Sequence, residues 1–595
     1  MKFNNIIKMM AVAAVAVTGL SSCDDFLTIY PTDKTIGEDF WKTKEDVDNM
    51  VTGAYSNMLS SEIQRRAIIW GAYRSDELVK NSSFSSTDLD NISAVNLLPT
   101  NGYNSWASFY SVINRCNIVL SHAEAVMEED PQFTLGDYNT ARGQMLSLRS
   151  LCYFYLVRAF RDVPYTTQSY ETDDVNMIIA QTSPDSVLQH CIDDLEEASK
   201  YVLKTGAYGS GNWRNKGYFT RDAVNALLAD IYLWRASMTK SASDYEKCIE
   251  YCDKVIEAKD LYYRENHNMA ASGDKSDIYH LTSGSIAFST IFGSSYGNAE
   301  ESILEWQYDG TANSNIGLEN LYYMTGSSKD HKSYGEVMAS SVFNVVDENA
   351  SNSNGRKMYQ SKNDRRFWDN VYEVGSEEAS ELYVRKMIDT DGYLQGTAVP
   401  TKGMDRSTSR AFDYFRQNWI VYRLTDVMLM KAEAQVQLAV DDDDIRLRQA
   451  FNLVQAVNNR SLYSGNLASD SLKFNYYKTR VDLEPLVMTE RLRELCFEGK
   501  RWYDLMRYNF RHVEGIDYGK TLYQQQEEGK EFTRNDATFL NLVTRKYTSG
   551  AAAAASKMRT EPYLYMPVNQ GDIDVNMNLR QNPAYRNDSE YEKNY

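Results

Sequence analysis

A pair of neighbouring amphipathic segments constrains the fold of this chain more than any other feature. The first, FTRDAVNALLADIYLWRAS (219–237), and the second, SDYEKCIEYCDKVIEA (243–258), both repeat apolar residues every three to four positions. Such a stripe marks one face of an α-helix, and that face needs a partner helix to bury it. The two segments are therefore predicted to form a helix pair.

The same pattern occurs toward both ends of the chain. It predicts helices over residues 44–59, 106–127, 137–160, 184–202, 425–438 and 445–460. Small Ala226 and Ala229 beside the first stripe make the central pair resemble a tetratricopeptide helix pair, although such pairs do not recur here at the regular unit of about 34 residues. The predicted fold class is mainly α: a degenerate tetratricopeptide-like scaffold of helix pairs, with a loop-rich region that carries short strands.

Residues 261–420 have a different character. Gly, Ser, Asn and Asp become frequent, and short alternating runs such as SILEWQYD (302–309) predict strands. The stretch is also rich in Tyr and Trp, and loops on a rigid scaffold are where binding sites are usually built. We therefore expect an N-terminal helical region at 23–260, a loop-rich ligand-binding region at 261–420 and a C-terminal region at 421–595 that completes the scaffold.

The C-terminal region contains three shorter features. The acidic tract 441–444 is predicted to be a solvated loop between helices, because consecutive acids cannot all face one calcium ion. The run GAAAAA (550–555) is predicted to be a loop. The segment MTERLRELCFEGKRWYDLMRYN (488–509) predicts a further helix. Its charged residues are spaced for three i,i+3 ion pairs: Glu490/Arg493, Arg491/Glu494 and Glu498/Arg501.

Residues 1–22 are expected to be a lipoprotein signal peptide. The apolar stretch that follows Lys2 is too short for a transmembrane span and fits the hydrophobic part of a secretory signal. Leu20–Cys23 resembles a bacterial lipobox, in which Cys23 is acylated; the alternative is a cleaved secretory peptide with an incidental cysteine. Asp24 and Asp25 resemble the acidic tag of surface-exposed Bacteroidetes lipoproteins, or else lie in a flexible tether. We expect an outer-membrane protein, lipid-anchored and exposed at the cell surface.

Composition excludes several functions. A net charge of −19 argues against nucleic-acid binding, which needs a basic surface. The cysteines after Cys23 form no CxxC motif. Cys248 and Cys252 each lie in an apolar stripe, so these two are expected to be buried thiols. The six histidines have no metal-ligand spacing, and the calcium-loop-like start at 389–392 has Pro400 where an acid is required. No metal or cofactor is expected.

Catalytic motifs are equally sparse. Gly293–Gly297 fits GxSxG, and SIAFSTIF (285–292) could be the preceding strand. A strand follows where a nucleophile elbow needs a helix, so a surface serine hydrolase around Ser295 is the less favoured alternative. A glycosidase needs two carboxylates placed across a sugar bond, and nothing singles out a pair among 82 acids. The chain is not expected to be an enzyme.

Several strings together resemble one family, the SusD/RagB outer-membrane nutrient-binding lipoproteins. The strings are PTDKTIGEDFWKTKEDVDNMVTGAY (31–55), WASFYSVINRCNIVL (106–120), FTRDAVNALLADIYLW (219–234), YRLTDVMLMKAEAQ (422–435), ERLRELCFEGKRWYDLMR (490–507) and LYMPVNQGDIDVNMNLRQNPAY (564–585). Each string alone is weak, but their combination and order are specific. The resemblance implies four degenerate helix pairs and a ligand-binding part packed on them.

The resemblance also implies a function. Members of this family cap a SusC-like TonB-dependent outer-membrane barrel as a hinged lid and deliver a glycan to it, while some capture oligopeptides. Aromatic rings stack on the C–H faces of sugars, and Asp, Asn or Arg bond their hydroxyls. The family's pocket lies at the loop before the second helix and in the middle region. Here this gives eight candidates, each of which could instead be a packing or ordinary surface residue: Trp70, Asp76, Tyr103, Trp106, Tyr296, Tyr322, Tyr323 and Trp368.

Overall fold

The computed structural model describes most of the chain. The described residues are 40–172, 176–270, 278–293, 297–323, 335–344, 358–359, 363–376, 379–388, 416–463 and 467–586, with the backbone alone described at 344, 372–376 and 379–380. Cys23 and Tyr296 therefore lie outside the described residues, as does Ser295 of the GxSxG sequence.

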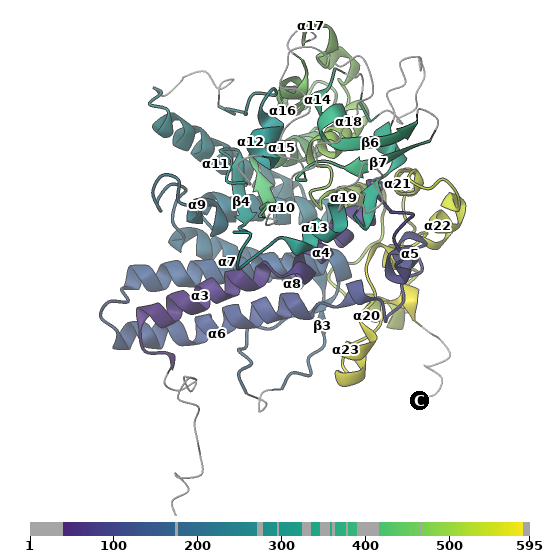
Figure 1. Cartoon of the computed structure of the whole chain (residues 1–595). Coiled ribbons are helices and arrows are strands. Elements are labelled where there is room, and N and C mark those ends of the chain that lie inside the picture. Colours follow the sequence, from purple (N-terminus) through teal and green to yellow (C-terminus); the bar gives the residue numbers. More distant parts are fainter. Residues whose placement is uncertain are drawn as a thin grey trace, which may run out of the picture.

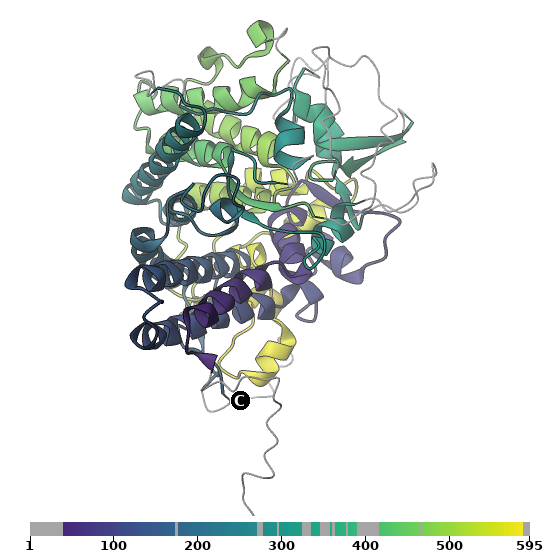
Figure 2. The ribbon, with the colours of Figure 1, turned by 60° about the vertical axis from the view of Figure 1, so that its left-hand side comes forward.

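Long helices form the scaffold, and successive helices along the chain pack against one another. They are α3 (Lys44–Met58), α6 (Ala107–Glu129), α7 (Leu135–Phe160), α8 (Pro184–Tyr201), α10 (Arg221–Thr239), α11 (Ala242–Asn266), α15 (Leu424–Leu438) and α16 (Ile445–Ser461). Figures 1 and 2 show them stacked along one side of the molecule. The mainly α, tetratricopeptide-like fold class is confirmed.

Local sequence explains where these helices begin and why they pack. Thr43 and Thr134 close reciprocal capping boxes at the starts of α3 and α7, and Pro184 occupies the first turn of α8. In the centre, α10 packs against α8 on one side and α11 on the other. Its residues are buried almost throughout, which requires the small Ala226 and Ala229 predicted beside its stripe.

Shorter elements complete the N-terminal part. They are α4 (Ser61–Ile68), a π-helical turn at Ile69–Tyr73, β1 (Leu78–Lys80), α5 (Thr87–Ser93), β2 (Val163–Pro164), β3 (Gln181–Thr182) and α9 (Arg214–Gly217). β2 pairs antiparallel with β3. The π-helical turn is wholly buried and continues directly from α4.

Short strands and helices form the middle of the chain and lie against the scaffold (Figure 2). They are α12 (Ala287–Phe292), β4 (Ser302–Trp306), α13 (Ile316–Tyr322), β5 (Val337–Ala339), α14 (Arg365–Asp369), β6 (Val371–Ser376), β7 (Ala379–Val384) and β8 (Trp419–Arg423). The antiparallel pairs are β1–β5, β4–β8 and β6–β7. The strand predicted in SILEWQYD is confirmed as β4. The strand considered for SIAFSTIF is wrong, because Ala287–Phe292 is helical.

Short helices follow in the C-terminal part. They are α17 (Leu467–Asp470), α18 (Arg480–Leu495), α19 (Arg501–His512), α20 (Leu522–Glu527), α21 (Ala537–Thr544), α22 (Ala551–Lys557) and α23 (Gln570–Val575). One of them, α19, packs against the π-helical turn. The acidic tract is a loop between α15 and α16, as predicted, whereas the alanine run predicted as a loop forms α22. Alanine has the highest helix propensity, and the prediction gave this too little weight.

The helix predicted over 488–509 is two helices. Phe497 and Gly499 take positive φ angles of 66° and 69° and end α18 before α19 begins. The turn lies directly against the π-helical turn: a Cβ on Gly71 would lie 1.9 Å from the carbonyl oxygen of Gly499. Gly71 therefore allows the two backbone segments to lie in contact, because any side chain at this position would hold them apart.

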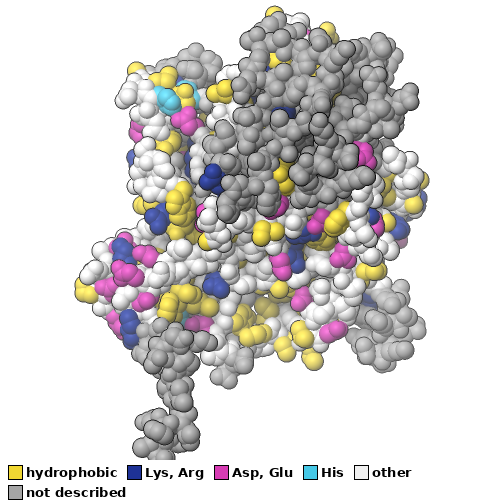
Figure 3. All heavy atoms as spheres, in the orientation of Figure 1, with side chains coloured by type: hydrophobic (Ala, Val, Ile, Leu, Met, Phe, Trp, Pro, Cys, Tyr) yellow, Lys and Arg dark blue, Asp and Glu magenta, His cyan; other side chains and the backbone are white. Residues whose placement is uncertain are grey.

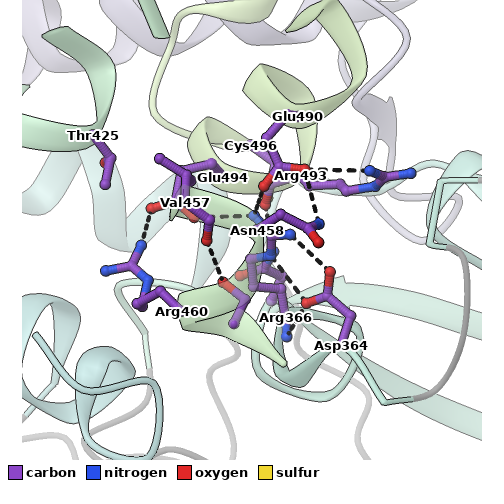
Figure 4. A network of polar contacts seen from close by, with 12 residues as sticks. Asp364, Arg366, Thr425, Val457, Asn458, Arg460, Glu490, Arg493, Glu494 and Cys496 are labelled. Carbon is purple, nitrogen blue, oxygen red and sulfur yellow. Dashed lines mark hydrogen bonds and ion pairs between the residues drawn. The ribbon is translucent and has the colours of Figure 1, made fainter. Parts of the chain in front are cut away.

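Buried ion pairs join the middle region to the scaffold (Figure 4). Glu494 of α18 accepts hydrogen bonds from Arg366 at 3.1 Å and from Arg423 at 2.6 Å, and it also pairs with Arg460. Glu490 binds Arg366 at 2.8 Å and Arg493 at 3.2 Å. All of these side chains are nearly or fully buried.

Of the three predicted i,i+3 pairs, Glu490/Arg493 is confirmed and the other two are wrong. Arg491 instead binds Asp426 and Asp504, each at 3.0 Å. The carboxylate of Glu498 binds Lys386 and Arg423. Charges predicted to pair with one another along a single helix thus lie in the interior, and most of them pair with other elements.

Candidate ligand-binding groove

Trp70 and Asp76, both predicted to contact ligand, are fully buried. Trp70 lies in the π-helical turn, donates its indole N–H to the carbonyl oxygen of Tyr103 at 2.9 Å and packs against Phe160. Asp76 accepts hydrogen bonds from Arg501 at 2.9 Å and from Arg545 at 2.6 Å. Neither side chain presents a surface to a ligand in this structure, and Asp76 forms buried salt bridges with both arginines.

Three candidates from the middle region are also buried. Tyr322, Tyr323 and Trp368 are 3–5% exposed. The Tyr322 hydroxyl donates to the carbonyl oxygen of Phe497 at 3.1 Å, which attaches the end of α13 to the turn between α18 and α19. These positions indicate packing of the middle region onto the scaffold rather than an open aromatic surface.

Tyr103 lies half-buried in the loop before α6, as expected for a ligand-binding position. Its hydroxyl accepts a hydrogen bond from Arg65 at 2.5 Å, and Arg65 also pairs with Glu336 at 2.6 Å. Glu336 immediately precedes β5, which pairs with β1. The loop before the second scaffold helix and the middle region therefore meet here, but the polar groups of this cluster are bonded to one another.

Trp106 lines a groove of about 440 Å³, formed mainly by α6, the segment after β2 and α23. The lining residues are Trp106, Ala107, Tyr110, Ser111, Ile113, Asn114, Asn117, Pro164, Thr166, Tyr170, Met177, Ile179, Asp572, Val575, Asn576 and Leu579. Trp106 is 5% exposed, as little as the buried candidates above, so only a small part of its ring lines the groove. It is held edge-on to Phe160, with ring centroids 5.1 Å apart, and to Tyr110 at 5.8 Å. Aromatic and polar side chains therefore share one concave surface.

Hydrogen bonds fix one wall of the groove to α6. Asn114 donates to the carbonyl oxygen of Tyr170 and accepts from its amide, both at 2.8 Å. Tyr110 donates its hydroxyl to the carbonyl oxygen of Pro164 at 2.5 Å. The amides of Asn114 and Asn117 are thus occupied by the protein's own backbone, and this wall is preorganised.

The C-terminal segment forms the opposite wall. Asn576 donates to the carbonyl oxygen of Ile179 at 2.9 Å, and Asn578 donates to that of Ile178 at 3.1 Å. The amide of Arg580 donates to Gln181 in β3 at 2.8 Å. These bonds bring α23 beside α6, although the two are separated by most of the chain.

Asp572 is, among the described residues that line this groove, the one with a buried polar side-chain atom left unsatisfied. Its Oδ2 is buried and has no hydrogen-bond partner in the part of the chain that the structure describes. Burial raises the pKa of Asp572 above its ordinary value of 3.8. Burial, and then the charges of Tyr153 and Asp572, raise the pKa of Tyr110. A buried acceptor without a partner is unfavourable unless a donor arrives, so a ligand hydroxyl would satisfy it.

Large apolar side chains stand at the rim of the groove. Met177 is 51% exposed and Val575 is 76% exposed. Figure 3 shows hydrophobic side chains along the lower edge of the molecule, in the region that Figure 1 assigns to α6 and β3. Within the described residues, no cluster of three His, Cys, Asp or Glu side chains is placed to hold a metal ion.

Sequence reasoning identified Trp106 but missed Asp572 and Tyr110, which lie inside the quoted strings. Tyr110 follows Trp106 by one helical turn, so its position on the same face was available from spacing. The position of Asp572 depends on contacts between α23 and residues 178–181, and no local pattern predicts them. The expectation that Cys248 and Cys252 are buried thiols is confirmed, and the four other described cysteines are buried as well.

Comparison with known proteins agrees with this architecture. A model of the SusD family matches residues 300–585, and a model described as starch-binding associating with outer membrane matches residues 25–233. A SusD-like protein of Formosa agariphila is 24% identical over 526 residues, covering 85% of this chain and 92% of that protein. A SusD-like protein of Bacteroides ovatus is 21% identical, covering 85% and 83%.

Solved structures show the same fold. A SusD superfamily protein from Bacteroides thetaiotaomicron has a TM-score of 0.60 at 21% identity and covers 92% of this chain and 99% of its own. A SusD-like protein from Bacteroides fragilis has a TM-score of 0.63 at 17% identity, covering 93% and 100%. In the described part of the chain, no helix combines the length and the apolarity needed to cross a membrane. The chain belongs to the SusD family.

Proposed function

We propose that this protein is a non-catalytic lipoprotein of the cell surface that binds a glycan and delivers it to a SusC-like TonB-dependent transporter, for which it acts as a lid. Family membership supports the glycan class, since one matching family model is described as starch-binding. The observation that carries the proposal is the Trp106 groove, whose lining combines aromatic rings with Asp572, a residue that has an unpartnered carboxylate oxygen.

The groove suits a sugar for two physical reasons. The rings of Trp106, Tyr110 and Tyr170 offer apolar faces or edges to sugar C–H groups. Asp572 supplies an acceptor for a hydroxyl in a position shielded from water, where a hydrogen bond is worth more than at the surface. The fixed wall on α6 keeps the ordering cost of binding low.

Binding without hydrolysis fits the same geometry. A glycosidase needs a second carboxylate several ångströms from the first, and Asp572 is the one acid among the described residues lining the groove. The serine-hydrolase alternative loses support, because the segment before Ser295 is helix α12 instead of the strand that a nucleophile elbow requires.

Anchoring and partnership follow from the lipobox resemblance and the family. Acyl chains on Cys23 would hold the body at the outer membrane while it swings as a lid. Cys23→Ala is expected to abolish membrane retention and to remove the protein from surface labelling of intact cells. Retention and labelling at the wild-type level would contradict the anchor.

Isothermal calorimetry against a panel of glycans and oligopeptides tests the ligand class. Saturable heat is expected with at least one glycan, and Asp572→Asn is expected to weaken that binding. The oligopeptide alternative rests on the exposed apolar rim, since Met177 and Val575 would suit peptide side chains. Saturable peptide binding with no heat from any glycan would overturn the proposal.

A further inference from the structure

A second pocket lies on the scaffold and, among the described residues, shares no lining side chain with the Trp106 groove. Its volume is about 460 Å³. It is lined by Thr52, Tyr55, Ser56, Met58, Leu59, Leu148, Leu151, Trp213, Gly217, Tyr218, Phe219, Leu304, Trp306, Gln307, Tyr308, Asp309 and Asn313. Helices α3 and α7, the segment around α9 and the segment beginning in β4 therefore enclose it.

Aromatic rings form the walls of this pocket. Tyr55 and Tyr218 are stacked with ring centroids 4.4 Å apart, and Trp213 meets Tyr218 edge-on at 5.4 Å. Trp213 is 44% exposed, so part of its ring remains open, while Trp306 is 5% exposed. Leu148, Leu151 and Leu304 add aliphatic surface between the rings. The pocket is thus apolar over most of its lining.

Most polar groups of the pocket already have partners within the protein. The Tyr55 hydroxyl bonds Gln144 and accepts from the amide of Phe219 at 3.1 Å. The Thr52 hydroxyl lies 3.1 Å from that of Tyr218.

The polar side chains that follow β4 are occupied as well. Gln307 exchanges hydrogen bonds with Asn298 and accepts another from Asn418 at 2.9 Å. The carboxylate of Asp309 accepts from the amides of Thr311 at 2.7 Å and Asn313 at 3.0 Å. A ligand with many hydroxyls would find few open partners here.

One buried donor among the described lining residues has no partner. The indole Nε1 of Trp306 is buried and makes no hydrogen bond within the described part of the chain. An unpaired buried donor costs roughly 1–3 kcal/mol, so an acceptor placed beside it would be stabilising. Asp309 is exposed and carries the only charged side chain among the described lining residues. The Arg214 guanidinium lies 5.2 Å from the ring centroid of Trp213 and 5.8 Å from that of Tyr218. With opposite charges beside the pocket, a neutral ligand fits better than an ion.

We infer that this pocket binds a neutral, planar and largely apolar small molecule that carries a hydrogen-bond acceptor. The rings of Tyr55, Trp213 and Tyr218 supply the flat surfaces, and Trp306 supplies the donor. The volume lies within the usual range for small-molecule sites, about 300–1,000 Å³. This ligand class is distinct from the glycan proposed for the Trp106 groove, and the two sites are expected to fill independently.

Coumarin is a suitable probe, because it is a neutral planar lactone whose carbonyl oxygen accepts hydrogen bonds. We expect saturable binding to the purified full chain in isothermal calorimetry, with one coumarin per chain. Octahydrocoumarin, which keeps the carbonyl but is not planar, is expected to bind at least several-fold more weakly. Trp213→Ala removes one exposed wall and should weaken coumarin binding roughly five-fold or more, which corresponds to about 1 kcal/mol of aromatic contact.

Two further variants sharpen the test. Tyr476→Ala removes an aromatic ring that is 75% exposed and lies outside both sites, and it should leave coumarin affinity unchanged. Trp306→Phe keeps an aromatic ring without the N–H, and it should lower coumarin affinity while thermal melting confirms folding. No saturable coumarin binding, or an unchanged affinity in Trp213→Ala, would overturn the inference. Glycan affinity should be unaffected by Trp213→Ala, so failure here is distinguishable from failure of the proposed function.

Discussion

Replacing Asp76 by Asn separates a structural role from a ligand-binding role. Asp76 is fully buried and pairs with Arg501 of α19 and with Arg545, which follows α21. Burial alone would raise the pKa of Asp76, but the charges of Arg501 and Arg545 outweigh burial and lower it from 3.8 to about 2. The carboxylate therefore stabilises the folded state at neutral pH.

The magnitude follows from that pKa. A lowering of just under two units corresponds to about 2 kcal/mol of stability. Breaking a buried ion pair by removing one partner costs roughly 3–5 kcal/mol, because the other charge is left uncompensated. Asp76→Asn keeps the volume but loses the charge, so we expect a loss of unfolding free energy between about 2 and 5 kcal/mol at pH 7.

Urea denaturation followed by circular dichroism measures this loss. Asp442→Asn, in the exposed loop between α15 and α16, is the matched control and should change stability by less than about 0.5 kcal/mol. The pKa of Asp76 is lower in the folded state, so its contribution is complete above pH 3.8 and disappears as the pH falls toward 2. The difference between wild type and variant should shrink over that interval. A variant of normal stability that no longer binds glycan would refute the structural role.

Two other predictions concern the buried network and the groove. Glu494→Ala removes a carboxylate from Arg366, Arg423 and Arg460 and should lower the free energy of unfolding by roughly 3–5 kcal/mol in denaturant titration. Glu250→Ala, at an exposed ion pair, should lower it by under about 1 kcal/mol. Equal losses in the two variants would contradict the role assigned to burial. Glycan affinity should fall as the pH is lowered toward the raised pKa of Asp572, because a hydroxyl donor favours the ionised carboxylate. In calorimetry at several pH values, the glycan affinity of Asp572→Asn should not change with pH. A pH dependence of affinity equal to that of wild type would assign the dependence to another group.

The helical scaffold was predictable because its signals are local. The helices predicted over 184–202 and 137–160 are observed at Pro184–Tyr201 and Leu135–Phe160, where apolar stripes and caps lie within the segment itself. Short apolar runs were less informative: SIAFSTIF was considered as a strand and is largely helix α12. Periodicity alone does not separate a short buried strand from a short buried helix.

The candidate site was only partly predictable, because tertiary contacts decide which side chains are exposed. Asp76 is paired with arginines more than 400 residues away, and no sequence spacing reveals such a partner. Trp70 and Tyr322 occur in the expected segments, but packing against distant elements buries both rings. Asp572 reaches the groove because Asn576 and Asn578 attach its segment to residues 178–179. The resemblance therefore predicted the fold and the family correctly. Which side chains line an open surface became clear only from the three-dimensional structure.

Calorimetric titration of the glycan that binds wild-type protein into Trp106→Ala tests the central claim most directly. The truncation removes the ring that faces the groove, and aromatic contacts contribute roughly 0.5–1.5 kcal/mol beyond buried area. We expect binding weaker by about 1 kcal/mol or more, which is roughly five-fold in affinity, with the fold intact by circular dichroism. A folded Trp106→Ala protein with wild-type glycan affinity would contradict the assignment of the glycan to this groove.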